Sequence, residues 1–404
     1  MKVKLLIAAL VVIALGQSAH ATGLQPVPVY TFLCSGNVQF RYGKCPQGGR
    51  PDVLLAGSDG KLYGTTQVSE EGDSDPLGGT IFSYTADGKG QVLYTFQPGA
   101  GNTYPNGDMP SGLIEGPDGK LYGSTLSGGS TGYGLLFRIN RDGSDFTIVH
   151  TFCSSLNCAD GVGGTLSVIG ADGDLYGAGS SGGAYGYGVI YRVIPSTGEY
   201  DVVFNFTNAL SDSGPSFGVI LGSGGILYGL QGNELFQYNP ANGDFSETTL
   251  PFPLVNGLPS GPATGLTIGP NGNLCGLYAI YSSPGVGVFE VNTDGSNFQF
   301  LPAYDPNFIH SGPIYMMLAS DQNFWVTEYI GGSSDGGAIV KVSPTTGGLL
   351  ATEATFSSTG NTGAYPDVLI QLKNKTFVGA TTQYGTAASG HFADGVIFHL
   401  NAGL

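Results

Sequence analysis

Two aspartates stand in matching local settings, far apart in the chain. Asp52 follows Pro51, Asp367 follows Pro366, and each Pro-Asp pair opens an apolar run. Two carboxylates that meet can hold Ca²⁺, a cationic ligand or a hydroxyl-rich ligand, because hard cations prefer oxygen ligands. Two solvated residues at the start of strands are the simpler interpretation, and the sequence leaves both open.

Tyrosine and short polar residues gather in two expected loops and suit a carbohydrate ligand. An aromatic ring stacks on the face of a sugar, while amide and carboxylate groups bind its hydroxyls. Ordinary loop composition explains the same residues, so carbohydrate binding is a hypothesis here. The residues are Tyr104 and Asp108, with Asn102 and Asn106, in the segment 99–111, and Tyr365 beside Pro366.

Other groups able to do acid–base chemistry are few. His391 and His310 fall in expected long loops, from which they can reach the rim of a site, whereas His150 and His399 fall in expected strands. The sequence has no Gly-x-Ser-x-Gly, His-Glu-x-x-His or phosphate-loop motif. The enzymatic alternative is therefore a metal-dependent hydrolase or lyase that uses paired acids such as Asp52 and Asp367.

The elements that must position these residues come from a repeat of about 50 residues. Its core is Asp-Gly-Lys-Leu-Tyr-Gly, at 59–64 and again at 118–123. Further copies, some degenerate, lie at 172–177, 225–229, 271–276, 321–326 and 375–382, which makes seven in all.

Each repeat predicts four antiparallel strands. An apolar run is followed by an Asp-Gly turn and the Leu-Tyr-Gly strand, then by a third strand such as 79–82 and a last strand such as 92–96. Asp-Gly supplies the positive φ angles that short hairpin loops need. Seven such units predict an all-β fold, a seven-bladed β-propeller. The long loops lie between second and third strands and between blades, so we expect a site on the face that carries them.

The two ends of the chain complement each other. The seventh repeat stops after its third strand, at 396–400, and Val-Pro-Val-Tyr-Thr-Phe at 27–32 matches the last strand of the first repeat. We therefore expect strand 27–32 to complete blade 7 and close the ring, which removes exposed sheet edges. An open β-solenoid is the alternative, and it would need no such match between the ends.

The motifs at 59–66, 78–82 and 93–96 resemble the Gloeo/Verruco (GloVer) tandem repeat family of exported bacterial choice-of-anchor proteins. The resemblance spans essentially the whole chain after residue 21 and is closest in the first three repeats. It implies export and repeat architecture, but no activity and no catalytic residues. Members of that family end in varied surface anchors, whereas this sequence shows none.

Residues 1–21 have the pattern of a signal peptide. Lys2 and Lys4 precede an apolar run at 5–15, and Ala19 and Ala21 give a small-residue cleavage site. We expect residues 22–404 to form one domain, secreted or periplasmic/extracellular, with no membrane insertion after signal cleavage. An uncleaved anchor is the alternative.

Five cysteines fit an oxidising compartment. Each of two expected long loops holds a close pair, which predicts the disulfides Cys34–Cys45 and Cys153–Cys158, and leaves Cys275 as a buried thiol within a strand.

The net charge of −16 argues against nucleic acid as a partner. We expect a monomeric binding module for carbohydrate or a cell-surface protein, with Ca²⁺ as the one cofactor considered. A structural or adhesive surface protein is a further alternative.

Overall fold

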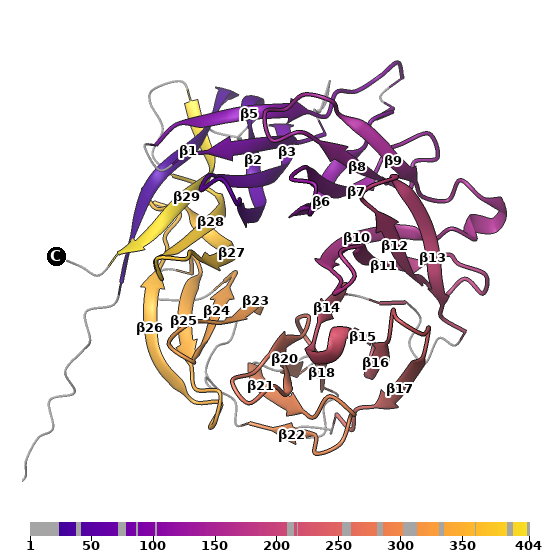
Figure 1. The fold of residues 1–404 in the computed structure, drawn as a ribbon. Helices are drawn as coiled ribbons and strands as arrows, with labels where there is room; N and C mark the ends of the chain where they lie inside the picture. The colour runs from indigo at the N-terminus through magenta and orange to yellow at the C-terminus, as the bar shows by residue number, and fades with distance from the viewer. Residues whose placement is uncertain are drawn as a thin grey trace, which may run out of the picture.

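Seven blades surround a central channel in the computed structural model (Figure 1). The structure describes residues 24–37, 42–71, 78–85, 88–101, 103–207, 214–215, 217–252, 260–280, 286–301, 313–330, 335–359, 361–385 and 391–401. The expected signal peptide, His310 and Asn102 lie outside these residues. No helix in the described part is long and apolar enough to span a membrane.

The strands run from the channel outward in each blade. Blade 1 contains β2 (Tyr42–Ala56), β3 (Leu62–Glu71), β4 (Thr80–Tyr84) and β5 (Gly90–Thr95). Blade 2 contains β6 (Asp108–Glu115), β7 (Leu121–Ser127), β8 (Leu135–Ile139) and β9 (Thr147–Thr151). Blade 3 contains β10 (Val162–Ile169), β11 (Leu175–Ser181), β12 (Val189–Ile194) and β13 (Glu199–Asn205). Blade 4 contains β14 (Val219–Leu221), β15 (Leu227–Gln231), β16 (Glu234–Tyr238) and β17 (Phe245–Thr249).

The remaining blades follow the same order. Blade 5 contains β18 (Ser260–Pro262), β19 (Thr267–Ile268), β20 (Leu274–Ile280), β21 (Val286–Val291) and β22 (Gln299–Phe300), and both β18 and β19 pair with β20. Blade 6 contains β23 (Pro313–Leu318), β24 (Phe324–Glu328), β25 (Ala338–Val342) and β26 (Leu349–Thr355). Blade 7 contains β27 (Ala364–Gln371), β28 (Phe377–Gln383), β29 (His391–Asn401) and β1 (Gln25–Asn37). Two short 3₁₀ turns are η1 (Leu156–Cys158) and η2 (Ser223–Gly225).

The predicted closure of the ring is confirmed. β1 pairs antiparallel with β29, with Val27 opposite His399 and Pro28 opposite Phe398. β1 also pairs with β2 near residues 35–37 and 42–44, so blades 7 and 1 share one continuous sheet (Figure 1). The expectation that Cys34 and Cys45 lie in a long loop is wrong, because both belong to these extended strands.

The tyrosine and the glycine of the Leu-Tyr-Gly motif make contacts that explain why both residues recur. Tyr63 is fully buried, and its hydroxyl donates to Asp59 of the preceding turn at 2.8 Å. Gly64 lies opposite Phe82, whose ring covers the space that a Cβ at Gly64 would occupy. The same glycine–aromatic pair recurs in five other blades, whereas blade 6 has Val326 opposite Val340. The tyrosines at this position, Tyr63, Tyr122, Tyr176 and Tyr228, are all buried in the core.

Adjacent blades contact through the recurring prolines. The Pro51 ring lies against Gly395 of blade 7, and the Pro110 ring lies against Gly79 of blade 1. Gly395 and Gly79 have φ of 113° and 98°, a region that favours glycine, and the proline rings leave no room for a side chain. Proline is tolerated here because each sits at a register shift of its strand pair.

Candidate functional site

Asp52 and Asp367, predicted to be neighbours, come together across the junction of blades 7 and 1. Asp52 lies on β2 and Asp367 on β27, the innermost strands of these blades. They are close enough that the charge of Asp367 raises the pKa of Asp52.

The two carboxyl groups have unlike surroundings. Asp52 accepts a hydrogen bond from the Thr65 hydroxyl at 2.8 Å and one from the Gln67 amide at 3.3 Å. Burial is the main cause that raises the pKa of Asp52 to about 8, with Asp367 adding to it. Burial alone raises the pKa of Asp367 to about 6. At neutral pH the protonated carboxyl of Asp52 can therefore donate a proton, and the ionised carboxylate of Asp367 can accept one.

The channel wall on the far side is lined by apolar side chains together with Ser and Thr hydroxyls. Inner strands of blades 3 to 6 line a cavity of about 760 Å³. Phe217 and Tyr315 are 44% and 37% exposed there, and Met316 and Met317 lie beside them. Ser111, which follows Pro110 as Asp52 follows Pro51, forms a hydrogen bond with Ser124 at 3.3 Å.

Tyr104 and Asp108 brace the connection between blades 1 and 2. The Tyr104 carbonyl accepts hydrogen bonds from the Gly107 and Gly129 amides. Asp108 accepts a hydrogen bond from Ser127 at 2.9 Å, and burial raises its pKa. Both side chains are half-buried. The structure does not bring them into one site with Asp52.

Tyr365 belongs to a separate group of tyrosines. Its ring stacks on Tyr329 at 4.9 Å between centroids and lies 6.0 Å from Tyr384. All three are half-buried. His391 was expected in a loop, but it begins β29 and pairs with Ser35 of β1, so that expectation is wrong; its side chain lies outside the described residues.

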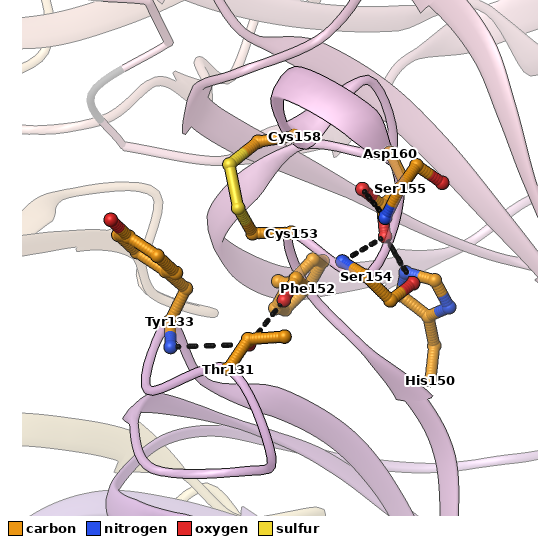
Figure 2. Close-up of a disulfide and its surroundings, with 9 residues drawn as sticks. All are labelled: Thr131, Tyr133, His150, Phe152, Cys153, Ser154, Ser155, Cys158 and Asp160. Atoms are coloured by element: carbon orange, nitrogen blue, oxygen red, sulfur yellow. Dashed lines mark hydrogen bonds and ion pairs between the residues drawn. A yellow bond between two sulfur atoms is a disulfide. The ribbon is translucent and has the colours of Figure 1, made fainter.

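The Cys153–Cys158 loop has its own polar anchor (Figure 2). Buried Asp160 accepts hydrogen bonds from the Ser154 hydroxyl at 2.7 Å and the Ser155 amide at 3.1 Å, and contacts His150 Nε2 at 3.0 Å. Burial raises the pKa of Asp160, but the hydrogen bonds from Ser154 and Ser155 outweigh it and hold that pKa below its usual value.

This cluster does not have the geometry of a catalytic triad. The Ser154 hydroxyl bonds the carboxylate and not His150, so the imidazole is not placed to take its proton. The His150 ring instead stacks on Tyr200 at 3.7 Å, and burial lowers its pKa. The cluster therefore holds the disulfide loop in shape. The predicted disulfides Cys34–Cys45 and Cys153–Cys158 are both present, and Cys275 is a buried thiol.

Three exposed tyrosines next to this loop are absent from the sequence-based candidates. Tyr133 is 49% exposed, Tyr185 61% and Tyr187 39%. They belong to two similar loops, Ser-Gly-Gly-Ser-Thr-Gly-Tyr-Gly at 127–134 and Ser-Gly-Gly-Ala-Tyr-Gly-Tyr-Gly at 181–188. The recurrence of Gly-Tyr-Gly at equivalent places in neighbouring repeats is the signal that could have identified them.

The disulfide loop supports both tyrosine loops. Thr131 donates its hydroxyl proton to the Phe152 carbonyl at 2.6 Å, and the Gly183 amide donates to the Cys158 carbonyl at 2.9 Å. Figure 2 shows the Tyr133 ring extending from its loop beside Thr131. We call the side chains of Tyr133, Tyr185 and Tyr187 the tyrosine surface.

The family model of the Gloeobacter/Verrucomicrobia repeat matches residues 50–279, which is more than half of the chain. The chain belongs to the Gloeobacter/Verrucomicrobia repeat family. The matched part runs from β2 to β20 and so covers blades 1 to 4 and part of blade 5. No curated protein matches the sequence of this family member.

Solved structures share the fold of this repeat protein at low identity. Virginiamycin B lyase from Staphylococcus aureus is 16% identical, with a TM-score of 0.54 over 90% of this chain and 98% of that one. An ulvan lyase of polysaccharide lyase family PL25 is 11% identical, with a TM-score of 0.57 over 93% and 96% of the chains. The extracellular domain of a hybrid two-component system from B. thetaiotaomicron is 12% identical, with a TM-score of 0.54 over 90% of this chain and 42% of that one.

Proposed function

We propose that this protein is an exported binding module that holds a neutral carbohydrate on the tyrosine surface of blades 2 and 3. The observation that carries the proposal is the exposure of Tyr133, Tyr185 and Tyr187 on loops supported by a disulfide. A tyrosine ring covers the apolar face of a sugar while its hydroxyl stays in water, so exposed tyrosines suit such a ligand.

Charge and stiffness support the same ligand class. Segments 127–134 and 181–188 contain no charged residue, although the chain as a whole has a net charge of −16. A surface without charge favours a neutral partner over an ionic one. The hydrogen bonds from Thr131 and Gly183 to the disulfide loop restrain both segments before binding, which lowers the entropy lost when a ligand orders them.

Export rests on two features that are independent of the tyrosine surface. The first 21 residues have the pattern of a signal peptide. The two disulfides fit a secreted or periplasmic location, where the redox environment keeps cysteines oxidised.

The test is the thermal midpoint of residues 22–404 against a panel of soluble neutral polysaccharides. A ligand that binds only the folded state raises this midpoint by mass action. We expect at least one polysaccharide to raise it, and the Tyr133→Ala/Tyr187→Ala double variant to lose that rise. The Tyr133→Phe/Tyr187→Phe control keeps both rings and should keep the rise. No response across the panel, or an equal response in the alanine variant, contradicts the proposal and favours a structural or adhesive role.

A second candidate, a metal-dependent hydrolase or lyase, uses the channel. The raised pKa values of Asp52 and Asp367 favour acid–base work by this pair. Among the described residues, the one group of three potential metal-binding side chains is Cys34, Cys45 and Asp394, and its cysteines form a disulfide. Thermal midpoints with Ca²⁺ and with EDTA separate the candidates: a rise with Ca²⁺ that Asp52→Asn abolishes supports the channel site.

A further inference from the structure

At two seams, a turn residue of one blade is bridged to the inner strand of the next blade, on the face opposite the long loops. At the seam of blades 1 and 2, the turn residue Ser58 donates its amide and hydroxyl to the Glu115 carboxylate at 2.7 and 2.6 Å. Arg141 completes the bridge at 3.1 Å from Glu115. At the seam of blades 6 and 7, the Ser320 amide donates to Gln371 at 2.8 Å. Glu115 and Gln371 are the last residues of their inner strands.

The seam of blades 7 and 1 has neither of these two bridges. The corresponding last residue of the inner strand is Ala56, which has no polar side chain, and the turn residue that corresponds to Ser58 is Lys373. A cavity of about 300 Å³ opens at this place. We call it the seam pocket; its lining includes Lys61, Leu62, Tyr84, Leu372, Lys373 and His399.

The seam pocket combines cationic and apolar groups. Two of the 14 lysine and arginine residues of the chain line this one cavity. Within the described part of the chain, neither Lys61 nor Lys373 forms a salt bridge. Asp59 is the nearby acid, and its carboxylate already accepts hydrogen bonds from the Tyr63 hydroxyl and the Lys61 amide.

His399 adds a polar group to the otherwise apolar wall. It lies on β29, and its half-buried imidazole has no hydrogen-bond partner among the described residues. A neutral imidazole keeps one N–H donor, which suits an acceptor oxygen in the cavity. Leu62, Tyr84 and Leu372 offer an apolar surface beside it.

We infer that the seam pocket binds an organic carboxylate with a short apolar chain. The carboxylate lies between the ammonium groups of Lys61 and Lys373, and the chain packs against Leu62, Tyr84 and Leu372. Such a ligand supplies at this seam the acidic bridge that Glu115 supplies between blades 1 and 2. It therefore joins the first and last blades and stabilises the closed ring. The inference is independent of carbohydrate binding on the tyrosine surface.

The test is a titration of residues 22–404 with sodium hexanoate, followed by isothermal calorimetry and by the thermal midpoint. We expect saturable binding and a rise of the midpoint, and at least a tenfold loss of affinity in Lys61→Ala/Lys373→Ala. Lys120→Ala is the matched control, because Lys120 has the place of Lys61 in the next repeat but does not line the seam pocket, and it should bind as the wild type does.

Two further ligands separate the contributions of charge and apolar contact. Hexan-1-ol has the same chain without the charge, and inorganic phosphate has charge without the chain; we expect both to bind at least tenfold more weakly than hexanoate. Equal binding of hexanoate and hexan-1-ol would overturn the inference, as would wild-type affinity in Lys61→Ala/Lys373→Ala. The Tyr133→Ala/Tyr187→Ala variant should bind hexanoate normally, so this test and the carbohydrate test can fail separately.

Discussion

The seams between blades 1 and 2 and between blades 7 and 1 are built from equivalent elements, yet one is bridged and the other is open. Glu115, Ser58 and Arg141 join the first pair of blades, whereas Ala56 and Lys373 leave a cavity of about 300 Å³ between the second. The closing seam relies instead on strand pairing through β1 and on the Cys34–Cys45 disulfide. The same repeat therefore gives seams that differ in their polar contacts and in the space between the blades.

The largest predicted effect tests whether the closing seam is packed as firmly as the others. Phe32 and Phe96 are the last residues of equivalent Tyr-Thr-Phe segments, and both are fully buried. The centroids of the Phe32 and Phe82 rings are 5.2 Å apart, and those of the Phe96 and Phe137 rings are 5.6 Å apart. Phe32→Ala and Phe96→Ala should each lower the free energy of unfolding by about 3–5 kcal/mol, as measured by denaturant titration. A much smaller loss in Phe32→Ala would mean that the seam is not closed in solution.

The two disulfides should each raise the free energy of unfolding, and the one that closes the longer loop should raise it more. Cys34 and Cys45 are 11 residues apart, and Cys153 and Cys158 are 5 apart. Loop entropy predicts a loss of about 3 kcal/mol for Cys34→Ala/Cys45→Ala and about 2 kcal/mol for Cys153→Ala/Cys158→Ala in denaturant unfolding. The reverse order would show that the disulfide beside the closing seam adds little to it.

The bridge between blades 1 and 2 should contribute less to the free energy of unfolding than either disulfide. Glu115→Ala leaves the Ser58 amide and Arg141 without their acceptor, so we expect a loss of about 1–2 kcal/mol in denaturant unfolding. Ala56→Gln provides the control at the closing seam and should change stability by less than about 0.5 kcal/mol, because Ala56 is exposed. If Glu115→Ala leaves the free energy of unfolding unchanged, the bridge at this seam does not stabilise the protein and the two seams do not differ in this respect.

The last prediction concerns the channel side of the closing seam and depends on pH. The pKa of Asp52 rises from 3.8 to about 8 on folding, so the folded state holds this proton more tightly than the unfolded chain. Stability from this group is therefore present at pH 4 and is lost as the pH rises toward 8. Asp52→Asn stays neutral at every pH, so its stability relative to the wild type should rise between pH 4 and pH 9, measured by denaturant unfolding at each pH. If the stability of the wild type and of Asp52→Asn changes with pH in the same way, then burial and the charge of Asp367 do not raise the pKa of Asp52 in the folded protein.

The fold was predictable because each repeat is a continuous segment of the sequence, and its turn and core residues contact residues of the same or the next repeat. Asp-Gly turns, the Tyr63-type tyrosines and the match of strand 27–32 to the last strand of the first repeat are all visible along the chain. The pairing of Asp52 with Asp367 also followed, once closure of the ring placed blades 1 and 7 together.

The seam pocket and the tyrosine surface depend on contacts that no local pattern reveals. Lys61 and Lys373 are far apart in sequence, and only the closed ring brings them to one cavity. Tyr133 and Tyr63 are the same residue type beside a glycine, yet one is 49% exposed and the other is fully buried. Their difference comes from position, since Tyr63 lies within a central strand and Tyr133 in a loop closed by glycines.

The most direct test of the account is calorimetric titration of sodium hexanoate into the wild type and into Ala56→Glu. The new carboxylate takes the place that Glu115 has at the neighbouring seam, so it should pair with Lys373 and occupy the seam pocket. We predict saturable binding by the wild type and at least a tenfold weaker binding by Ala56→Glu, with no loss in the thermal midpoint of the ligand-free protein. Equal affinities for hexanoate in the two proteins would contradict the claim that a carboxylate binds beside Lys373 in the seam pocket.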